Sequence, residues 1–239
     1  IDRGILTCIE SGVVNSISIS INGRSINLKT LSVLLSSLLK KKIKIGCHIT
    51  LVGERWISDE NIFFTDWVQL SLNLLQDHKR LLSKIKKEIE TQITVLRTSC
   101  QILSHIDSHQ HIHMLPSLFK LFKESQLTHN IPRIRVPYCL DYRLVKPSLP
   151  GFVLQHLSQK QNGLPNTLPC CGLKYSGNYT AEKFINELSL IGNVPCELIV
   201  HPGYDTASLK NSYANWNYNW KNEINALLSD KFHDFLRNH

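Results

Sequence analysis

Segments with the two-residue period of a β-strand alternate along this 239-residue chain with segments of helical spacing. Residues 13–21 place isoleucines and serines on opposite sides of an extended chain, and the Asn22-Gly23 pair that follows is a turn signal. Strands that alternate with helices predict an α/β fold with a largely parallel sheet and outer helices. We expect strands at 13–21, 43–51, 103–114, 134–136 and 196–201, helices at 4–11, 27–40, 66–100, 117–124, 181–190 and 222–236, and an irregular stretch at 140–178.

Three of the predicted strands carry a histidine at or near the carboxyl end. His48 closes the second strand, His201 closes the last one, and residues 105–113 contain a group of histidines. The carboxyl ends of parallel strands meet at one edge, where the connecting loops build binding and catalytic sites. We therefore expect a functional site at this edge.

The histidine group is His105, Asp107, His109, His111 and His113, all at odd positions. On a strand these side chains share one face, with neighbours roughly 6–7 Å apart. A metal–nitrogen bond is only about 2.0–2.1 Å long, so one ion can bind one of these histidines, or two adjacent ones. The other members would then orient a ligand, contact substrate or pack. A polar face of hydrogen-bonded histidines is the alternative, and this density of histidines argues against it.

The other two histidines are less specific when each is taken alone. His48 follows Gly46-Cys47 at the end of an apolar strand, a position that, taken alone, is more typical of a hydrogen-bonded core histidine than of a metal ligand. His201 lies between an apolar strand and the Pro202-Gly203 turn. That position suits general acid–base catalysis, and an ordinary turn histidine is the alternative.

Taken together and in this order, the segments resemble the YdjC-like carbohydrate deacetylase family, which includes the chitooligosaccharide deacetylases. The resemblance covers nearly the whole chain. Its most specific piece is the histidine segment that ends in Met114-Leu115-Pro116. The other matching pieces are residues 4–6, 11–14, 21–23, Ile45-Gly46-Cys47-His48, Ile134-Arg135-Val136-Pro137 and 197–204.

The resemblance implies a deformed TIM-barrel-like fold, which we expect to form one domain over residues 1–239. It also implies hydrolysis of acetyl groups from N-acetylated amino sugars, with a divalent metal, Mg²⁺ first and Zn²⁺ as the alternative. By motif, His48 and His109 would be metal ligands and His201 a catalytic acid or base. Arg135 would contact substrate or the developing oxyanion. Asp107, His111 and His113 would support the ligands or contact substrate.

One family motif has no counterpart in the sequence. The family's third metal ligand is an aspartate in an Ala-Asp-Asp-Phe-Gly motif, and the neighbouring aspartate is its general base. The place of this motif lies immediately upstream of Ile1, so we expect a sequence truncated at its N-terminus, or a protein that has lost the motif. An inactive sugar-binding module is therefore an alternative function, as is another barrel-type metallo-amidohydrolase.

The composition of the chain indicates which binding partners and which cellular compartment to expect. The seven cysteines are scattered without a Cys-x-x-Cys pair, which favours reduced thiols in a cytoplasmic protein. The net charge of +8 could attract nucleic acid, but no aromatic residues accompany the lysine clusters, which favours solvated helix faces. No apolar stretch approaches the roughly 20 residues needed to span a bilayer. The expected partners are an N-acetylated amino sugar or oligosaccharide and, as an option, a second copy of the chain in a homodimer, with no nucleic acid and no membrane.

Overall fold

The computed structural model describes residues 3–23, 26–204, 206 and 218–238. The chain folds into two compact units, each of which is described by itself below. The first unit comprises residues 1–15, 137–162 and 168–239, and the second comprises residues 16–136 and 163–167. The expectation of one domain over residues 1–239 stays a prediction.

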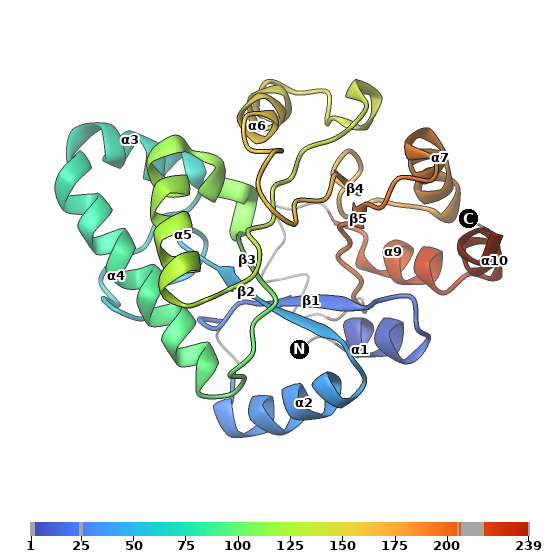
Figure 1. Cartoon of the computed structure of the whole chain (residues 1–239), viewed down its shortest axis with the longest axis horizontal. Helices are drawn as coiled ribbons and strands as arrows, with labels where there is room; N and C mark the ends of the chain where they lie inside the picture. The colour runs from blue at the N-terminus through green and yellow to red at the C-terminus, as the bar shows by residue number, and fades with distance from the viewer. Residues whose placement is uncertain (1–2, 24–25, 205, 207–217, 239) are drawn as a thin grey trace. The chain divides into compact units, whose positions relative to one another are not determined.

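The second unit is built on a three-stranded parallel sheet (Figure 1). Its strands are β1 (Ser16–Ile19), β2 (Lys44–Ile49) and β3 (His105–Ser108), in that spatial order. Helix α2 (Leu28–Lys40) connects β1 to β2, and α3 (Trp67–Gln76) and α4 (His78–Arg97) connect β2 to β3. The expected α/β class with parallel strands is confirmed, although each strand is shorter than its sequence pattern predicts.

The predicted helix at 66–100 is two helices that meet at Asp77. The backbone of Asp77 is not helical, at φ −137° and ψ 63°, and it ends α3 just before α4 begins. Asp66 caps α3 by accepting hydrogen bonds from the two backbone N–H groups of Val68 and Gln69. The apolar face of α4 is buried and packs on β2, while α3, α4 and α5 (Pro116–Thr128) lie side by side (Figure 1).

The predicted strand at 103–114 is wrong beyond Ser108. A 3₁₀ segment, η1 (His109–Met114), follows β3 directly, and Gln110 and His111 both have φ near 53°, in the left-handed region. Only His105 and Asp107 of the odd-numbered group therefore share a strand face. The remaining histidines of the group lie on a turn that leads into α5.

The first unit contains a short parallel strand pair, β4 (Cys170–Cys171) and β5 (Glu197–Leu198). The predicted irregular stretch at 140–178 holds one substantial helix, because Ser148 caps it and its proline lies in the first turn, where no hydrogen bond is lost. The predicted helix at 222–236 is divided in two. Within the described residues of this unit, the helical segments are α1 (Arg3–Glu10), η2 (Tyr142–Leu144), α6 (Leu149–Gln159), α7 (Ala181–Ile191), α9 (Trp220–Leu227) and α10 (Asp230–Asn238).

The described strands do not close into a barrel. They form the three-stranded sheet, the two-stranded sheet and one isolated parallel bridge from Ile106 to Ile134. The deformed TIM-barrel-like arrangement stays a prediction. Among the helices of the described ranges, none combines the length and the apolar character needed to cross a membrane.

Candidate functional site

A histidine–aspartate pair lies on neighbouring strands of the second unit. The register of β2 and β3 sets His48 opposite Asp107, and the Nδ1 atom of His48 lies 2.9 Å from Oδ1 of Asp107. The Asp107 side chain is 1% exposed, whereas the His48 side chain is 26% exposed. A carboxylate on Nδ1 fixes the ring orientation and directs Nε2, the other nitrogen, toward any ligand.

Arg135 supplies the opposite charge for the buried carboxylate. Its Nη1 atom forms an ion pair with Oδ2 of Asp107, and its Nη2 atom lies 3.3 Å from Nε2 of His105. Burial by itself would raise the pKa of Asp107, but the charges of Arg135 and His48, with the hydrogen bond from His48, hold that pKa well below its usual range. Asp107 is therefore an ionised acceptor at neutral pH.

His105 completes this network from inside the sheet, and Ser18 joins it from β1. The Ser18 hydroxyl lies 2.7 Å from Nε2 of His105 and 3.3 Å from Oδ2 of Asp107. A β-carbon at position 46 would overlap the His105 ring, so the glycine of Gly46 makes room for it. The sequence did not single out Ser18, although its position on the serine face of an alternating strand was visible.

His109 lies next to His48. The centroids of the two rings are 5.8 Å apart and the rings are nearly perpendicular. Two imidazoles bound to one ion through nitrogen atoms about 2.1 Å from it would have centroids roughly 4.5–5.5 Å apart. The observed spacing is slightly larger, so the rings would have to approach each other to share one ion, and the role of both histidines as ligands stays a prediction. Gly53, at φ +81°, passes close to the His109 ring.

His113 is committed to the fold through both ring nitrogens. Nδ1 lies 2.7 Å from the hydroxyl of Ser108, and Nε2 lies 2.8 Å from the backbone oxygen of Arg135. Burial lowers the pKa of His113 to about 4, so the ring is neutral at physiological pH. His113 thus holds η1 against the segment of Arg135, and its predicted role in supporting the ligands or contacting substrate stays a prediction.

His111 has a different environment. Its ring lies 6.4 Å from that of His113, and burial, followed by the charge of His113, lowers the pKa of His111 well below its usual range. Among the described residues, its buried Nδ1 atom has no hydrogen-bond partner. A supporting or substrate-binding role for His111 stays a prediction.

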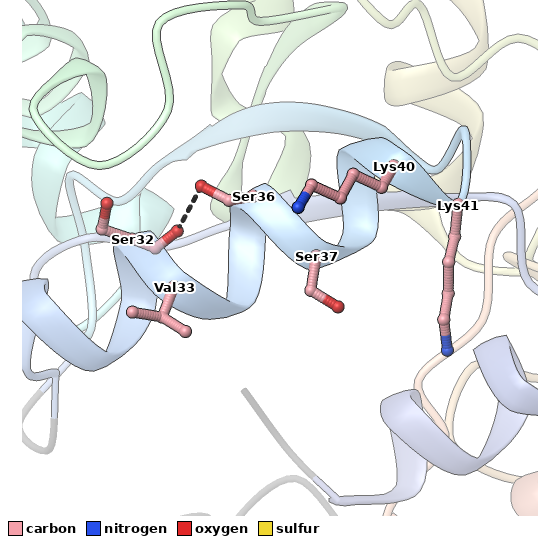
Figure 2. A pocket seen from close by; sticks show the side chains of 6 residues that line it. All are labelled: Ser32, Val33, Ser36, Ser37, Lys40 and Lys41. Carbon is pink, nitrogen blue, oxygen red and sulfur yellow. Dashed lines mark hydrogen bonds between the residues drawn. The ribbon is translucent and has the colours of Figure 1, made fainter.

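The described part of the chain contains no group of three His, Cys, Asp or Glu side chains placed to hold a metal ion. The predicted ligands His48 and His109 would thus supply only part of the donors that a metal ion needs. A shallow pocket elsewhere in this unit runs along α2 and holds none of the predicted site residues (Figure 2). Its lining includes Lys40 and Lys41, which are exposed, in keeping with a solvated helix face.

His201 belongs to the first unit, just after β5. Its backbone N–H donates to Oε2 of Glu223 over 2.7 Å, and its ring centroid lies 5.6 Å from that of Tyr218. Glu223 was not recognised in the sequence, because a single glutamate in an amphipathic helix gives no signal of burial.

These observations define an α/β protein with parallel strands, in which polar side chains pair at the ends of the strands. The chain belongs to the YdjC-like family, whose model matches residues 1–238. It is 29% identical over 152 residues to a carbohydrate deacetylase of Xenopus laevis, a match that covers 57% of this chain and 46% of that protein. The chain thus spans about half the length of this curated relative.

A solved structure has the same fold. It is that of a proposed cellobiose-phosphate cleavage protein of Enterococcus faecalis, with a TM-score of 0.69, 18% sequence identity, and coverage of 99% of this chain and 88% of that one. At this level of identity the similarity concerns the fold alone.

Proposed function

We propose that this protein is a carbohydrate deacetylase that hydrolyses the acetamide of N-acetylated amino sugars with the help of a divalent metal. The observation that carries the proposal is the His48–Asp107 pair with His109 beside it. An imidazole oriented by a carboxylate is the usual arrangement of a histidine metal ligand. Membership of the YdjC-like family and the similarity to a carbohydrate deacetylase support the reaction class.

The metal would be held by His48, through Nε2, and by His109. The family resemblance favours Mg²⁺ and leaves Zn²⁺ as the alternative. The donor chemistry of two imidazoles favours Zn²⁺, because Mg²⁺ prefers oxygen ligands. Either ion needs at least one further ligand beyond these two nitrogens. When bound, it would polarise the amide carbonyl and lower the pKa of a bound water.

The side chains of the protein itself have separate tasks in this proposal. Asp107 fixes the tautomer of His48, and Arg135 keeps Asp107 ionised. The guanidinium of Arg135 is engaged with Asp107, so holding this carboxylate is its first task, and contact with the developing oxyanion would be a second one. His201 would protonate the leaving amine, a task that suits an imidazole near neutral pH.

The proposal is tested by acetate release from N,N′-diacetylchitobiose, measured together with metal binding by calorimetry. His109→Ala should abolish both signals, whereas the matched control His78→Ala should leave both unchanged, since His78 is exposed at the start of α4 in the same unit. Undiminished acetate release by the His109→Ala variant would refute the assignment. Sugar binding without acetate release by the unaltered protein would instead favour the sugar-binding module.

A further inference from the structure

A single buried carboxylate in the first unit joins two loops. Glu223 lies in the first turn of α9 and its side chain is fully buried. Its Oε1 atom accepts the backbone N–H of Gly177 over 2.6 Å, and its Oε2 atom accepts the backbone N–H of His201 over 2.7 Å. Gly177 follows β4 and His201 follows β5, so Glu223 connects the segments that leave the carboxyl ends of two paired parallel strands.

Glu223 is not needed to cap its own helix. The side chain of Asn219 accepts the backbone N–H of Asn222 and so caps α9. The carboxylate of Glu223 therefore accepts hydrogen bonds from the two loops and not from the start of its own helix. Its burial has a considerable energetic cost, which is recovered only when hydrogen bonds satisfy the charge.

The packing around His201 is tight on the side of Tyr218. The rings of His201 and Tyr218 have centroids 5.6 Å apart. Gly177 has φ +79°, and a β-carbon there would overlap the Tyr218 ring, so both its conformation and its surroundings require glycine. Glu223 thus fixes the backbone of His201, while Tyr218 fixes one side of its ring.

We propose that Glu223 is a positioning residue that holds His201 in place for acid–base catalysis. The inference rests on the proposed function, because it presumes that His201 transfers a proton in the reaction. A displacement of about 1 Å at a catalytic group can lower a rate by roughly 100-fold. Loss of the hydrogen bond to the His201 backbone should therefore affect turnover more than substrate affinity.

The protonation of this carboxyl gives a direct signal of the contact. Burial raises the pKa of Glu223 to about 7, even though the N–H groups of His201, Gly177 and Tyr179 favour the ionised form. Tyr218 is a titratable neighbour in the described part of the chain, and burial, with the nearby charge of Glu223, raises the pKa of Tyr218. The ionised carboxylate accepts both N–H groups strongly, so their signals should move together as the pH falls through about 7.

A matched control exists in the same unit. Glu187 is also buried, and it accepts the backbone N–H of Gly172 over 3.0 Å and the hydroxyl of Tyr179 over 2.8 Å. Through these two hydrogen bonds it holds the start of the same loop after β4, at a different point from the backbone of His201. Any general effect of losing a buried glutamate in this unit should appear in Glu187→Gln as well.

The experiment compares the unaltered protein with Glu223→Gln, Glu223→Asp and Glu187→Gln. The amide ¹H and ¹⁵N shifts of Gly177 and His201 should titrate together near pH 7 in the unaltered protein and not in Glu223→Gln. Glu223→Gln should lower kcat by roughly 10- to 100-fold with little change in KM. Glu187→Gln should retain kcat, and Glu223→Asp, which keeps the charge, should recover part of the lost turnover.

Two results would overturn the inference. One is a Glu223→Gln variant with the kcat and the pH profile of the unaltered protein, and the other is the absence of a common titration at Gly177 and His201. If Glu223→Gln does not fold, the inference is tested by the titration of the unaltered protein and by the kcat of Glu223→Asp. Normal titration of both amides in a protein that releases no acetate would count against the proposed function, and not against the contact itself.

Discussion

Replacing Asp107 with asparagine should destabilise the second unit severely. The substitution preserves shape but removes the negative charge that Arg135 and His48 share. The Arg135 side chain is only 12% exposed and would keep its positive charge without a buried counterion. Removal of one partner from a buried ion pair lowers the free energy of unfolding by about 3–5 kcal/mol. We expect a loss in this range at pH 7.5.

The pH dependence of this loss has a definite sign. The folded state holds the pKa of Asp107 well below its ordinary value of 3.8. The ionised carboxylate therefore stabilises the fold above that ordinary value, and the stabilisation disappears as the pH falls through the lower folded-state value. The difference in unfolding free energy between the unaltered protein and the variant should shrink in acid and stay constant above about pH 5.

Urea denaturation followed by tryptophan fluorescence measures this difference, since Trp56 is buried in the same unit. Glu124→Gln is the control, because it breaks the exposed pair of Glu124 with Lys86 and should change the free energy of unfolding by less than about 0.5 kcal/mol. Adding Arg135→Met to Asp107→Asn should recover part of the loss, as it removes the unpaired charge. A loss below about 1 kcal/mol, or one that is the same at acid pH, would refute this reasoning.

The remaining predictions concern the neighbours of this pair. Gly46→Ala should lower the free energy of unfolding by about 1–3 kcal/mol, because the new methyl group meets the His105 ring, whereas Gly163→Ala, in open space, should change it little. NMR titration of His113 should show a midpoint near pH 4. The neutral ring stabilises the fold above the ordinary pKa of 6.5, and this contribution is lost as the pH falls through about 4. A midpoint near 6.5 would contradict a buried, hydrogen-bonded His113. Asp107→Asn, where it folds, should weaken zinc binding by about 10- to 100-fold in calorimetry, and unchanged affinity would argue against His48 as an oriented ligand.

The alternation of strand and helix patterns was sufficient to predict the class of fold and the strand that carries His48, whereas the strand predicted at 196–201 is only Glu197–Leu198, and His201 lies beyond its end. The face of α4 was also predictable, since its apolar residues recur at helical spacing and are buried. These features depend on local periodicity, which a single sequence displays directly.

Residues 109–113 show where periodicity misleads. A histidine at every second position has the appearance of a strand, but the Ser108 hydroxyl accepts the backbone N–H of His113 and closes a turn. The left-handed conformations of Gln110 and His111 leave no period-two signature of their own. Contacts between segments distant in the chain, such as those of Arg135 with Asp107 and of Glu223 with His201, were likewise not visible in the sequence.

The sharing of Asp107 among several segments has a consequence for how the site assembles. Ser18 reaches it from β1, His48 from β2 and Arg135 from the segment beyond α5. The rotamer of His48 is thus selected when these segments come together, and not by the arrival of a ligand. A group ordered in this way loses little conformational entropy on binding. Folding of the sheet and preorganisation of the candidate site are therefore one cooperative event.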